Sequence, residues 1–461
     1  MRTKENVVQS NMSPTQSGER VSQGLSGVRQ VAKERKQERF TALLHHLSVG
    51  LLRDSFYALK RQAAPGVDGV TWKEYETGLE DRIADLHSRV HRGAYQARPS
   101  RRVYIPKADG RERPLGVAAL EDKVVQQAVV TILNQIYEMD FKGFSYGFRP
   151  GRNPHQALDA LTVGIQSKRV NWVLDADIRG FFDNLSHEWA IKFVEHRVAD
   201  PRILRLIQKW LKAGISEDGR WSESKVGTPQ GAVVSPLLAN VYLHYAFDLW
   251  VEAWRKKVAR GDMIVVRYAD DLVVGFQRRT DAEQFLQEFR ERLAKFGLEL
   301  HSEKTRLIEF GQHAERNRKR RGEGKPETFT FLGFTHFCGQ RISDGAFIVW
   351  RITAKKRMVA KLKAIKAELQ RQKHHRTTEV GAWLRKVVLG YYQYHAVPGN
   401  STQLRIFCRR IGWLWRSVLI RRSQRAQVRW DRLTPLLTRW IPQPRILHPY
   451  PDARFAATHP Q

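Results

Sequence analysis

Three aspartates stand near the end of one apolar segment of the chain and in the middle of another. Residues 171–178 (NWVLDADI) begin apolar and end in acids that include Asp177, whereas residues 263–276 (MIVVRYADDLVVGF) carry Asp270 and Asp271 between two apolar halves. Such β-branched runs are typical of strands, and the second segment predicts a strand, a two-residue turn and a strand. Carboxylates at neighbouring strand ends could hold hard divalent cations such as Mg²⁺.

A site of this kind suits one class of reaction. Nucleotidyl transfer develops charge on an attacking oxygen and on a leaving pyrophosphate, and two divalent ions roughly 4 Å apart neutralise both. Adjacent acids also occur in exposed turns that bind no metal, so the pair at Asp270 and Asp271 does not establish the site alone. Together with Asp177, the pair predicts a site for two Mg²⁺ ions, with Mn²⁺ as a substitute.

The charge of the chain indicates a polyanionic partner. Its 461 residues include 79 Lys and Arg against 47 Asp and Glu, a net charge of +32. Residues 351–461 alone hold 24 Lys and Arg against 4 Asp and Glu. This excess favours nucleic acid, with an ordinary basic surface as the alternative. Tryptophans interleaved with the basic residues suit base stacking as well as core packing; they are Trp383, Trp413, Trp415, Trp430 and Trp440.

Other classes of protein fit the composition poorly. The two cysteines, Cys338 and Cys408, are isolated, so the chain offers neither a disulfide framework nor a paired-cysteine zinc site. No apolar run approaches the roughly 18 residues of a membrane span, and the first residues lack the apolar core of a secretory signal. The sequence therefore predicts a soluble cytoplasmic protein that makes no contact with membranes.

The elements that must position the aspartates divide the chain into three parts. Residues 1–36 are polar and predict a disordered or loosely ordered arm, and residues 37–345 predict an α+β unit. Within that unit, residues 101–116 predict a hairpin that turns at Asp109 and Gly110, and residues 281–296 predict a helix with Asp281 as its N-cap. Residues 346–461 predict a basic helical domain with an apolar stripe, formed by Met358, Leu362, Ile365 and Leu369.

Seven ordered segments carry a resemblance to a known family. In chain order they are VYIPKADGRERPLG (103–116), FSYGFRPGRNPHQAL (144–158), VLDADIRGFFDNL (173–185), GTPQGAVVSPLLANVYL (227–243), RYADDLVVGF (267–276), LELHSEKTRLIEFG (298–311) and FTFLGFTHF (329–337). The series resembles the reverse transcriptase/maturase proteins encoded by bacterial group II introns, over roughly residues 37–455. The resemblance implies a right-hand polymerase, with fingers and an antiparallel palm in residues 37–345 and an α-helical thumb and maturase domain in residues 346–461.

The resemblance also implies roles for single residues around the three metal-binding aspartates. Tyr268 would lie beside the primer terminus, Phe182 would exclude a ribose 2′-hydroxyl, and Gln230 with Gly231 would support the incoming nucleotide. For Phe182 the alternative is a core aromatic. Lys304 would lie near the leaving pyrophosphate, either as a proton donor or as a phosphate partner.

Two cations and one further acid complete the predicted site. Lys107 and Arg113 lie on opposite sides of the predicted hairpin, where they could clamp a triphosphate unless they are solvated surface charges. Asp183 is expected to be structural, because it lies outside the metal pattern of the family.

The resemblance predicts an RNA-directed DNA polymerase that binds group II intron RNA, assists its splicing and copies it at a DNA target. Its other substrates would be a primer and deoxynucleoside triphosphates, and the working form would be a monomer or a homodimer. Many relatives continue into a zinc-bearing endonuclease domain, which this chain is expected to lack because it has no cysteine pairs. Two alternatives stay open: a domesticated relative in defence or repair, and an RNA-binding splicing factor without polymerase activity.

Overall fold

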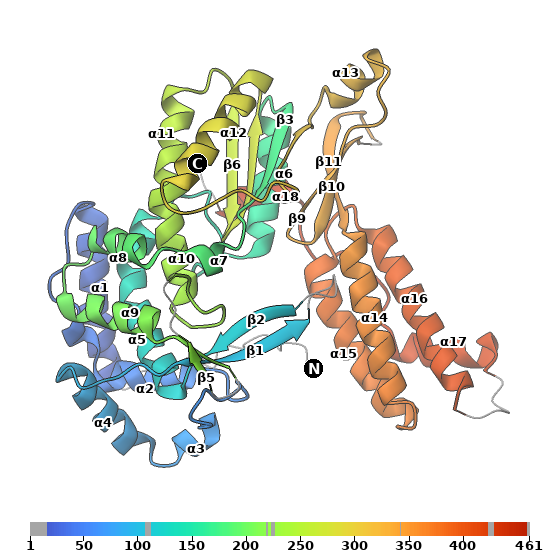
Figure 1. Cartoon of the computed structure of the whole chain (residues 1–461). Helices are drawn as coiled ribbons and strands as arrows, with labels where there is room; N and C mark the ends of the chain where they lie inside the picture. Colours follow the sequence, from blue (N-terminus) through green and yellow to red (C-terminus); the bar gives the residue numbers. More distant parts are fainter. Residues whose placement is uncertain are drawn as a thin grey trace.

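The computed structural model describes residues 16–106, 112–217, 220–222, 226–341, 343–422 and 428–458. Helices and three sheets are mixed along the chain, and most strand pairs are antiparallel (Figure 1). This architecture confirms the predicted α+β class. None of the helices in the described ranges is long and apolar enough to cross a membrane.

The central sheet holds the two acidic segments. Its strand order is β6-β7-β3-β8, and every neighbouring pair is antiparallel. The strands are β3 (Trp172–Asp177), β6 (Met263–Tyr268), β7 (Asp271–Phe276) and β8 (Arg306–Glu309). Successive side chains of a strand point to opposite faces. Accordingly Leu174 and Val274 enter the largest core, whereas Val173 and Val273 enter a second core on the other face. Burial of both faces explains why these segments are apolar throughout.

Most helices from the first three quarters of the chain enclose the largest core, whereas the buried residues of α6 belong to the second core. α12 packs against β3 and β7, and α6 packs against β6. These helices are α1 (Gln16–Glu34), α2 (Val49–Ala58), α3 (Trp72–Glu76), α4 (Leu79–His91), α5 (Leu120–Asp140), α6 (Pro154–Ser167), α7 (Phe181–Asn184), α8 (His187–Glu195), α9 (Pro201–Lys212), α10 (Ser235–Leu243), α11 (Leu249–Lys257) and α12 (Arg279–Ala294), with a 3-10 turn, η1 (Leu44–His46), and a π-helical turn, η2 (His244–Asp248).

Local sequence explains where several of these helices begin. In α6 the side chains of Asn153 and Gln156 form a reciprocal capping box, and Pro154 occupies the first turn. Asp200 caps α9 by accepting a hydrogen bond from the amide of Arg202. These caps satisfy amides that the first turn of a helix leaves without partners.

The first helix differs from the expected polar arm over residues 1–36. Residues 16–34 form α1, which packs against α5, and Leu25, Val28 and Ala32 are buried. Their spacing of three and four residues places these small apolar side chains on one face. Burial of these three side chains against α5 stabilises the helix, although the segment as a whole is polar. The first 15 residues of the expected arm lie outside the described part of the chain.

Helix α12 is present where a helix is expected, but Asp281 is not its cap. The helix begins at Arg279, and the carboxylate of Asp281 accepts hydrogen bonds from the amides of Arg260 (2.9 Å) and Gly261 (3.1 Å). Asp281 therefore stabilises the loop that follows α11. The prediction was wrong because a local pattern cannot reveal a partner about twenty residues away.

A second sheet contains the expected hairpin. Its order is β2-β1-β4-β5, formed by β1 (Ser100–Pro106), β2 (Glu112–Val117), β4 (Ile215–Glu217) and β5 (Arg220–Ser222). β1 and β2 are antiparallel, and Ile105 is paired with Arg113. The predicted turn at Asp109 and Gly110 lies outside the described residues, as does Lys107.

The remaining strands lead into a helical unit with a core of its own. The third sheet, β11-β10-β9, precedes four helices whose buried residues form a separate cluster (Figure 1). The predicted stripe belongs to it, since Met358, Ile365 and Leu369 are buried and Leu362 packs against them. The strands of this sheet are β9 (Phe329–Phe331), β10 (Phe334–Gln340) and β11 (Phe347–Thr353), preceded by the short helix α13 (Ala314–Arg320). The four helices are α14 (Lys355–Arg371), α15 (Thr377–His395), α16 (Ser401–Ile420) and α17 (Trp430–Trp440).

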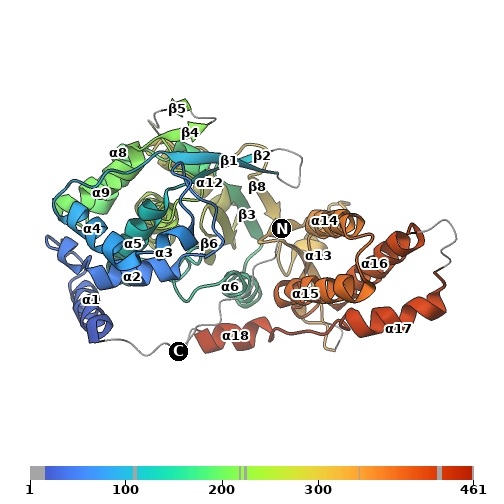
Figure 2. The same cartoon turned by 90° about the horizontal axis from the view of Figure 1, so that it is seen from below.

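After α17 the chain returns to the central sheet. Helix α18 (Pro451–Thr458) packs against α6 (Figure 2). The buried carboxylate of Asp159 on α6 pairs with Arg454 of α18 (2.5 Å) and with Arg351 of β11 (2.7 Å). The helical unit is thereby attached to α6 through both β11 and α18.

Candidate active site

The strand ends bring the predicted acids together. Asp177, the last residue of β3, is the direct cross-strand partner of Asp271, the first residue of β7. Asp271 is also opposite Tyr268, the last residue of β6. Directly opposed residues point to the same face with Cβ atoms about 4.5–5.5 Å apart. Tyr268, Asp271 and Asp177 therefore form a row across three strands, and Asp270 lies in the turn beside it.

The turn between β6 and β7 is held by a neighbouring segment. Ala269 adopts a left-handed conformation with φ of 56°. A Cβ atom at Gly147 would lie 2.2 Å from the amide nitrogen of Ala269, so the close approach requires glycine. Two backbone hydrogen bonds, from Arg267 to Phe144 and from Tyr146 to Arg267 (both 2.9 Å), extend this contact.

Burial and repulsion between neighbouring carboxylates raise the pKa values of Asp270 and Asp271. Burial raises the pKa of Asp271 to about 7, and repulsion by Asp270, Asp177 and Asp175 adds to the effect. Burial also raises the pKa of Asp270, with repulsion by Asp177 as a further cause. Asp271 still reaches solvent. Asp270 and Asp271 thus bind protons more readily than isolated carboxylates do.

Two cations are directed toward these acids. The ammonium group of Lys304 donates a hydrogen bond to the Asp177 carboxylate at 2.7 Å. Arg113, on β2, and Lys304 both act to lower the pKa of Asp270. The structure thus brings two of the three predicted cations close to the acids; Lys107 is the one that lies outside the described residues.

The three carboxylates fit divalent cations by their chemistry. They supply only hard oxygen donors, and their mutual repulsion is what a divalent cation would relieve. Within the described ranges, however, no three His, Cys, Asp or Glu side chains form a ready ligand cluster. Asp177 is turned toward Lys304 instead.

The predicted nucleotide contacts meet beside β2. The carbonyl of Phe182, on α7, accepts a hydrogen bond from the amide of Thr228 (2.8 Å), and the Phe182 ring is half-buried. The amide of Gly116, on β2, donates to the carbonyl of Gln230 (2.9 Å). Gly231 has φ of 117°, and a Cβ atom there would lie 3.0 Å from the carbonyl oxygen of Gly116. The turn at Gln230 and Gly231 therefore joins β2 to the segment that carries Phe182.

Asp183 and Gln230 are also linked. The side-chain amide of Gln230 donates to the exposed carboxylate of Asp183 at 3.5 Å. Asp183 follows Phe182 on α7 and is not among the residues whose charge perturbs Asp270 or Asp271.

Three further residues near the acids are not among those that the sequence predicts for the site. Phe148 is exposed, has φ of 59° and lies with its ring centre 6.4 Å from that of Tyr268. Asp175, two residues before Asp177 on the same face of β3, has a pKa raised to about 6 by burial. Arg357, near the start of α14, opposes the rise in the Asp271 pKa. The alternation of β3 could have indicated Asp175, whereas no local signal indicates the other two.

The part of the chain that carries the acids is similar to known proteins. Residues 105–336 match the family described as reverse transcriptase (RNA-dependent DNA polymerase). Protein YkfC of Escherichia coli (strain K12) is 34% identical over 298 residues, which are 56% of this chain and 78% of that protein. Group II intron-encoded protein LtrA of Lactococcus lactis subsp. cremoris is 36% identical over 219 residues, 46% of this chain and 36% of LtrA.

A plant relative extends the comparison. Nuclear intron maturase 1, mitochondrial, of Arabidopsis thaliana is 30% identical over 92 residues, 20% of this chain and 13% of that protein. The matched part thus spans well under half of LtrA and of the plant maturase. With the family match and the extensive match to YkfC, the chain belongs to the reverse transcriptases, the RNA-dependent DNA polymerases, of the group II intron reverse transcriptase/maturase type.

Proposed function

We propose that this reverse transcriptase binds group II intron RNA, assists its splicing and copies it into DNA by two-metal nucleotidyl transfer. The row of Tyr268, Asp271 and Asp177, with Asp270 in the adjoining turn, is the observation that carries the proposal. The arrangement supplies the carboxylates that nucleotidyl transfer requires. They lie at the ends of strands whose two faces are both buried, which supports a fixed position for the acids.

Asp177, Asp270 and Asp271 would hold two Mg²⁺ ions, which Mn²⁺ can replace. When bound, the ions supply charge neutralisation at the attacking 3′-oxygen and the leaving pyrophosphate. Lys304 would release Asp177 and pair with phosphate or donate a proton to the pyrophosphate. The observed contact between Lys304 and Asp177 supports this proposal, because it puts the ammonium group beside the acids.

Residues around the acids would bind the incoming deoxynucleoside triphosphate. Arg113, together with Lys107, would clamp its phosphates. The turn at Gln230 and Gly231 would lie under the nucleotide, and Phe182 would exclude a 2′-hydroxyl. The hydrogen bonds that join β2, this turn and α7 support a single nucleotide-binding surface. Tyr268 would contact the primer terminus.

The division of the cores supports a right-hand polymerase. The β1–β2 hairpin with helices α1 to α5 would form the fingers, the central sheet would form the palm, and α14 to α17 would form the thumb and maturase domain. The separate core of α14 to α17 favours a distinct thumb. We keep residues 37–345 as the proposed fingers and palm and residues 346–461 as the proposed thumb and maturase domain; the separate core that begins at Met358 supports a distinct unit within the latter range.

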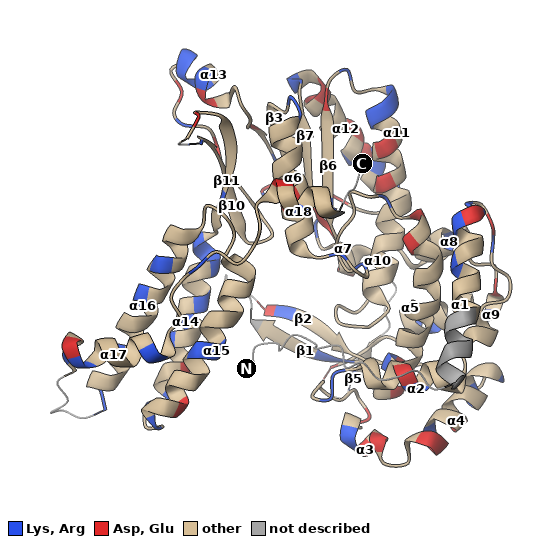
Figure 3. Cartoon of the chain, turned by 180° about the vertical axis from the view of Figure 1, so that it is seen from behind, with Lys and Arg blue, Asp and Glu red and all other residues tan. Residues whose placement is uncertain are grey.

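The helical unit would bind intron RNA and the DNA target. Lys and Arg are spread along α14, α15 and α16 (Figure 3). Trp413 and Trp430 are exposed, with ring centres 4.8 Å apart, and the guanidinium of Arg416 lies over Trp430. Exposed aromatic rings beside cations suit stacking on unpaired bases of structured RNA. Trp415, in contrast, is fully buried in the core.

Primer extension on an RNA template tests the proposal. Wild-type protein with Mg²⁺ is expected to extend a DNA primer, and Asp270→Asn is expected to abolish extension while leaving RNA affinity unchanged. Asp183→Asn is the matched control, because it removes an exposed charge near the site and is expected to retain extension. No extension by the wild type would remove the polymerase proposal and leave an RNA-binding splicing factor. Intron RNA flanking the coding region would separate a mobile intron protein from a domesticated relative.

A further inference from the structure

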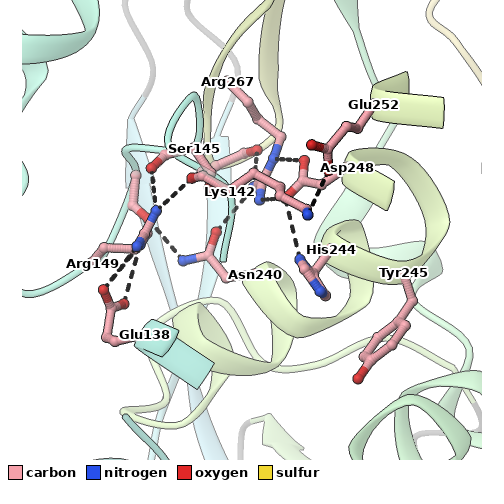
Figure 4. Close-up of polar contacts among 12 residues, drawn as sticks. Glu138, Lys142, Ser145, Arg149, Asn240, His244, Tyr245, Asp248, Glu252 and Arg267 are labelled. Carbon is pink, nitrogen blue, oxygen red and sulfur yellow. Dashed lines mark hydrogen bonds and ion pairs between the residues drawn. The ribbon is translucent and has the colours of Figure 1, made fainter. Parts of the chain in front are cut away.

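Arg267 immediately precedes the row of site residues, and its side chain is completely buried. Its guanidinium forms an ion pair with Asp248, whose side chain is also fully buried. The pair is bidentate, since Nε donates to Oδ1 at 2.7 Å and Nη2 donates to Oδ2 at 2.5 Å (Figure 4). This fork-to-fork geometry fixes the plane of the guanidinium as well as its position.

The third nitrogen of Arg267 contacts the turn itself. Nη1 donates to the carbonyl oxygen of Ala269 at 3.1 Å and to Oδ1 of Asn240 at 3.0 Å. Ala269 separates Tyr268 from Asp270 and has the left-handed backbone that residues other than glycine rarely adopt. A buried donor on its carbonyl therefore stabilises a conformation that the residue does not favour on its own.

Asn240 links this arrangement to the segment on the other side of the turn. Its side-chain nitrogen Nδ2 donates to the carbonyl oxygen of Gly147 at 2.7 Å. Gly147 is the residue packed against the backbone amide of Ala269. Arg149 holds the same segment by donating to the carbonyls of Lys142 (2.8 Å) and Ser145 (2.7 Å) (Figure 4). The turn is thus enclosed between two polypeptide segments that share one buried hydrogen-bonded network.

The position of Asp248 depends on an unusual helical turn. Asn240 lies on α10, and Asp248 ends η2, the π-helical turn that joins α10 to α11. π-helical turns are rare and frequently occur at functional sites. Here the turn brings Asp248 and Asn240, eight residues apart, to the same guanidinium.

We propose that Arg267, held by Asp248 and Asn240, is the positioning residue that orients Asp270 and Asp271 toward Asp177 and thereby sets the affinity of the site for divalent cations. The inference rests on the proposed function of these three aspartates. Arg267 touches neither substrate nor metal, and acts through the carbonyl of Ala269.

Lysine cannot replace Arg267 in this role. A guanidinium has five N–H donors in a rigid plane, whereas an ammonium presents three donors from a single atom. Arg267→Lys therefore preserves the charge opposite Asp248 but cannot contact both carboxylate oxygens, Asn240 and Ala269 together. The variant separates charge neutralisation from orientation of the turn.

The matched control is Arg197→Lys. Arg197 is also buried and ion-paired, with Asp140 at 3.3 Å, and it also donates to backbone carbonyls, including that of Ala32 at 3.4 Å. None of its contacts is with the turn at residues 268–271. Any general effect of replacing a buried arginine by lysine appears in both variants, and an effect on metal binding appears only in Arg267→Lys.

Mn²⁺ binding to the full chain, followed by electron paramagnetic resonance, gives a readout that needs no catalysis. Arg267→Lys is expected to weaken Mn²⁺ binding by about tenfold, as loss of a residue that orients metal ligands commonly does. The Mg²⁺ concentration that half-saturates primer extension is expected to rise in parallel, while primer–template affinity stays unchanged. Arg197→Lys is expected to retain wild-type metal affinity.

Wild-type Mn²⁺ affinity in Arg267→Lys, or the same loss in both variants, would overturn the inference. If Arg267→Lys does not fold by circular dichroism, Asn240→Ala decides, since it removes one contact to Arg267 and the contact to Gly147; unchanged Mn²⁺ affinity in that variant would also refute the role. Failure of the wild type to extend primers would count against the proposed function. The Mn²⁺ measurement would still test whether Arg267 sets the metal affinity of the site.

Discussion

Replacing Asp271 by asparagine should stabilise the protein in the absence of divalent cations while destroying its activity. Burial and the repulsion of Asp270, Asp177 and Asp175 raise the pKa of Asp271 to about 7. The folded protein therefore binds a proton at this site more tightly than the unfolded chain does. Stability from this group is fully present below the unfolded pKa and is lost as pH rises through the folded pKa.

The pKa itself gives an upper limit to the effect. A carboxyl pKa raised from 3.8 to about 7 corresponds to about 4 kcal/mol of lost stability at alkaline pH. Because Asp271 reaches solvent, screening reduces the expected effect to about 1–2 kcal/mol. For a chain of 461 residues, this predicts a rise in Tm of about 1–2 °C in Asp271→Asn at pH 8.

Differential scanning calorimetry in EDTA measures this effect. The advantage of Asp271→Asn over the wild type is expected to be small at pH 5 and to grow toward pH 8. Added Mg²⁺ is expected to stabilise the wild type more than the variant, because the ion relieves the same repulsion. Asp431→Asn is the control, since Asp431 is exposed and lies near Arg429 on the helical unit. A variant no more stable than the wild type at pH 8, or one whose advantage does not depend on pH, would refute the reasoning.

Three further predictions concern other parts of the molecule. Phe182→Ala is expected to raise incorporation of ribonucleotides relative to deoxyribonucleotides by about 10–200-fold in competition primer extension; an unchanged ratio would make Phe182 a core aromatic. Lys304→Ala is expected to slow extension by about 10²–10⁴-fold in single-turnover primer extension, because it removes the ammonium group beside the acids; an unchanged rate would exclude both roles proposed for Lys304. Joint replacement of Trp413 and Trp430 by alanine is expected to weaken filter binding of structured RNA by about 1–3 kcal/mol for each base unstacked, and unchanged affinity would exclude stacking at these rings.

Local patterns were sufficient to predict the elements that carry the acids. The apolar runs before Asp177 and around the turn at Asp270 indicate strands, and the turn chemistry indicates the hairpin. The register that brings Asp177 opposite Asp271 could not be read from the pattern. A shift of one residue moves every side chain to the other face, and these strands are apolar on both faces, so hydrophobicity does not distinguish the two registers.

Long-range partners account for most of what the sequence did not reveal. A charged residue within the apolar run MIVVRYADD signals that Arg267 needs a partner, but nothing in the sequence names Asp248, 19 residues earlier. Asp281 fits the pattern of a helix cap and instead binds amides of the preceding loop. The polar composition of residues 1–36 predicts a disordered arm. The short apolar stripe of Leu25, Val28 and Ala32 forms a buried helix face only because α5 packs against it.

The return of the chain to α6 constrains movement of the helical unit. A unit joined to its neighbour at one point can swing about a single hinge, whereas this unit is joined through β11 on one side and through α18 on the other. Because Arg351 and Arg454 share the carboxylate of Asp159, rotation about either connection must strain the other. The angle between the basic helices and the sheet that carries the acids is therefore constrained at two points. If these helices bind a long RNA template, as proposed, the template would keep a constant path toward the strand ends.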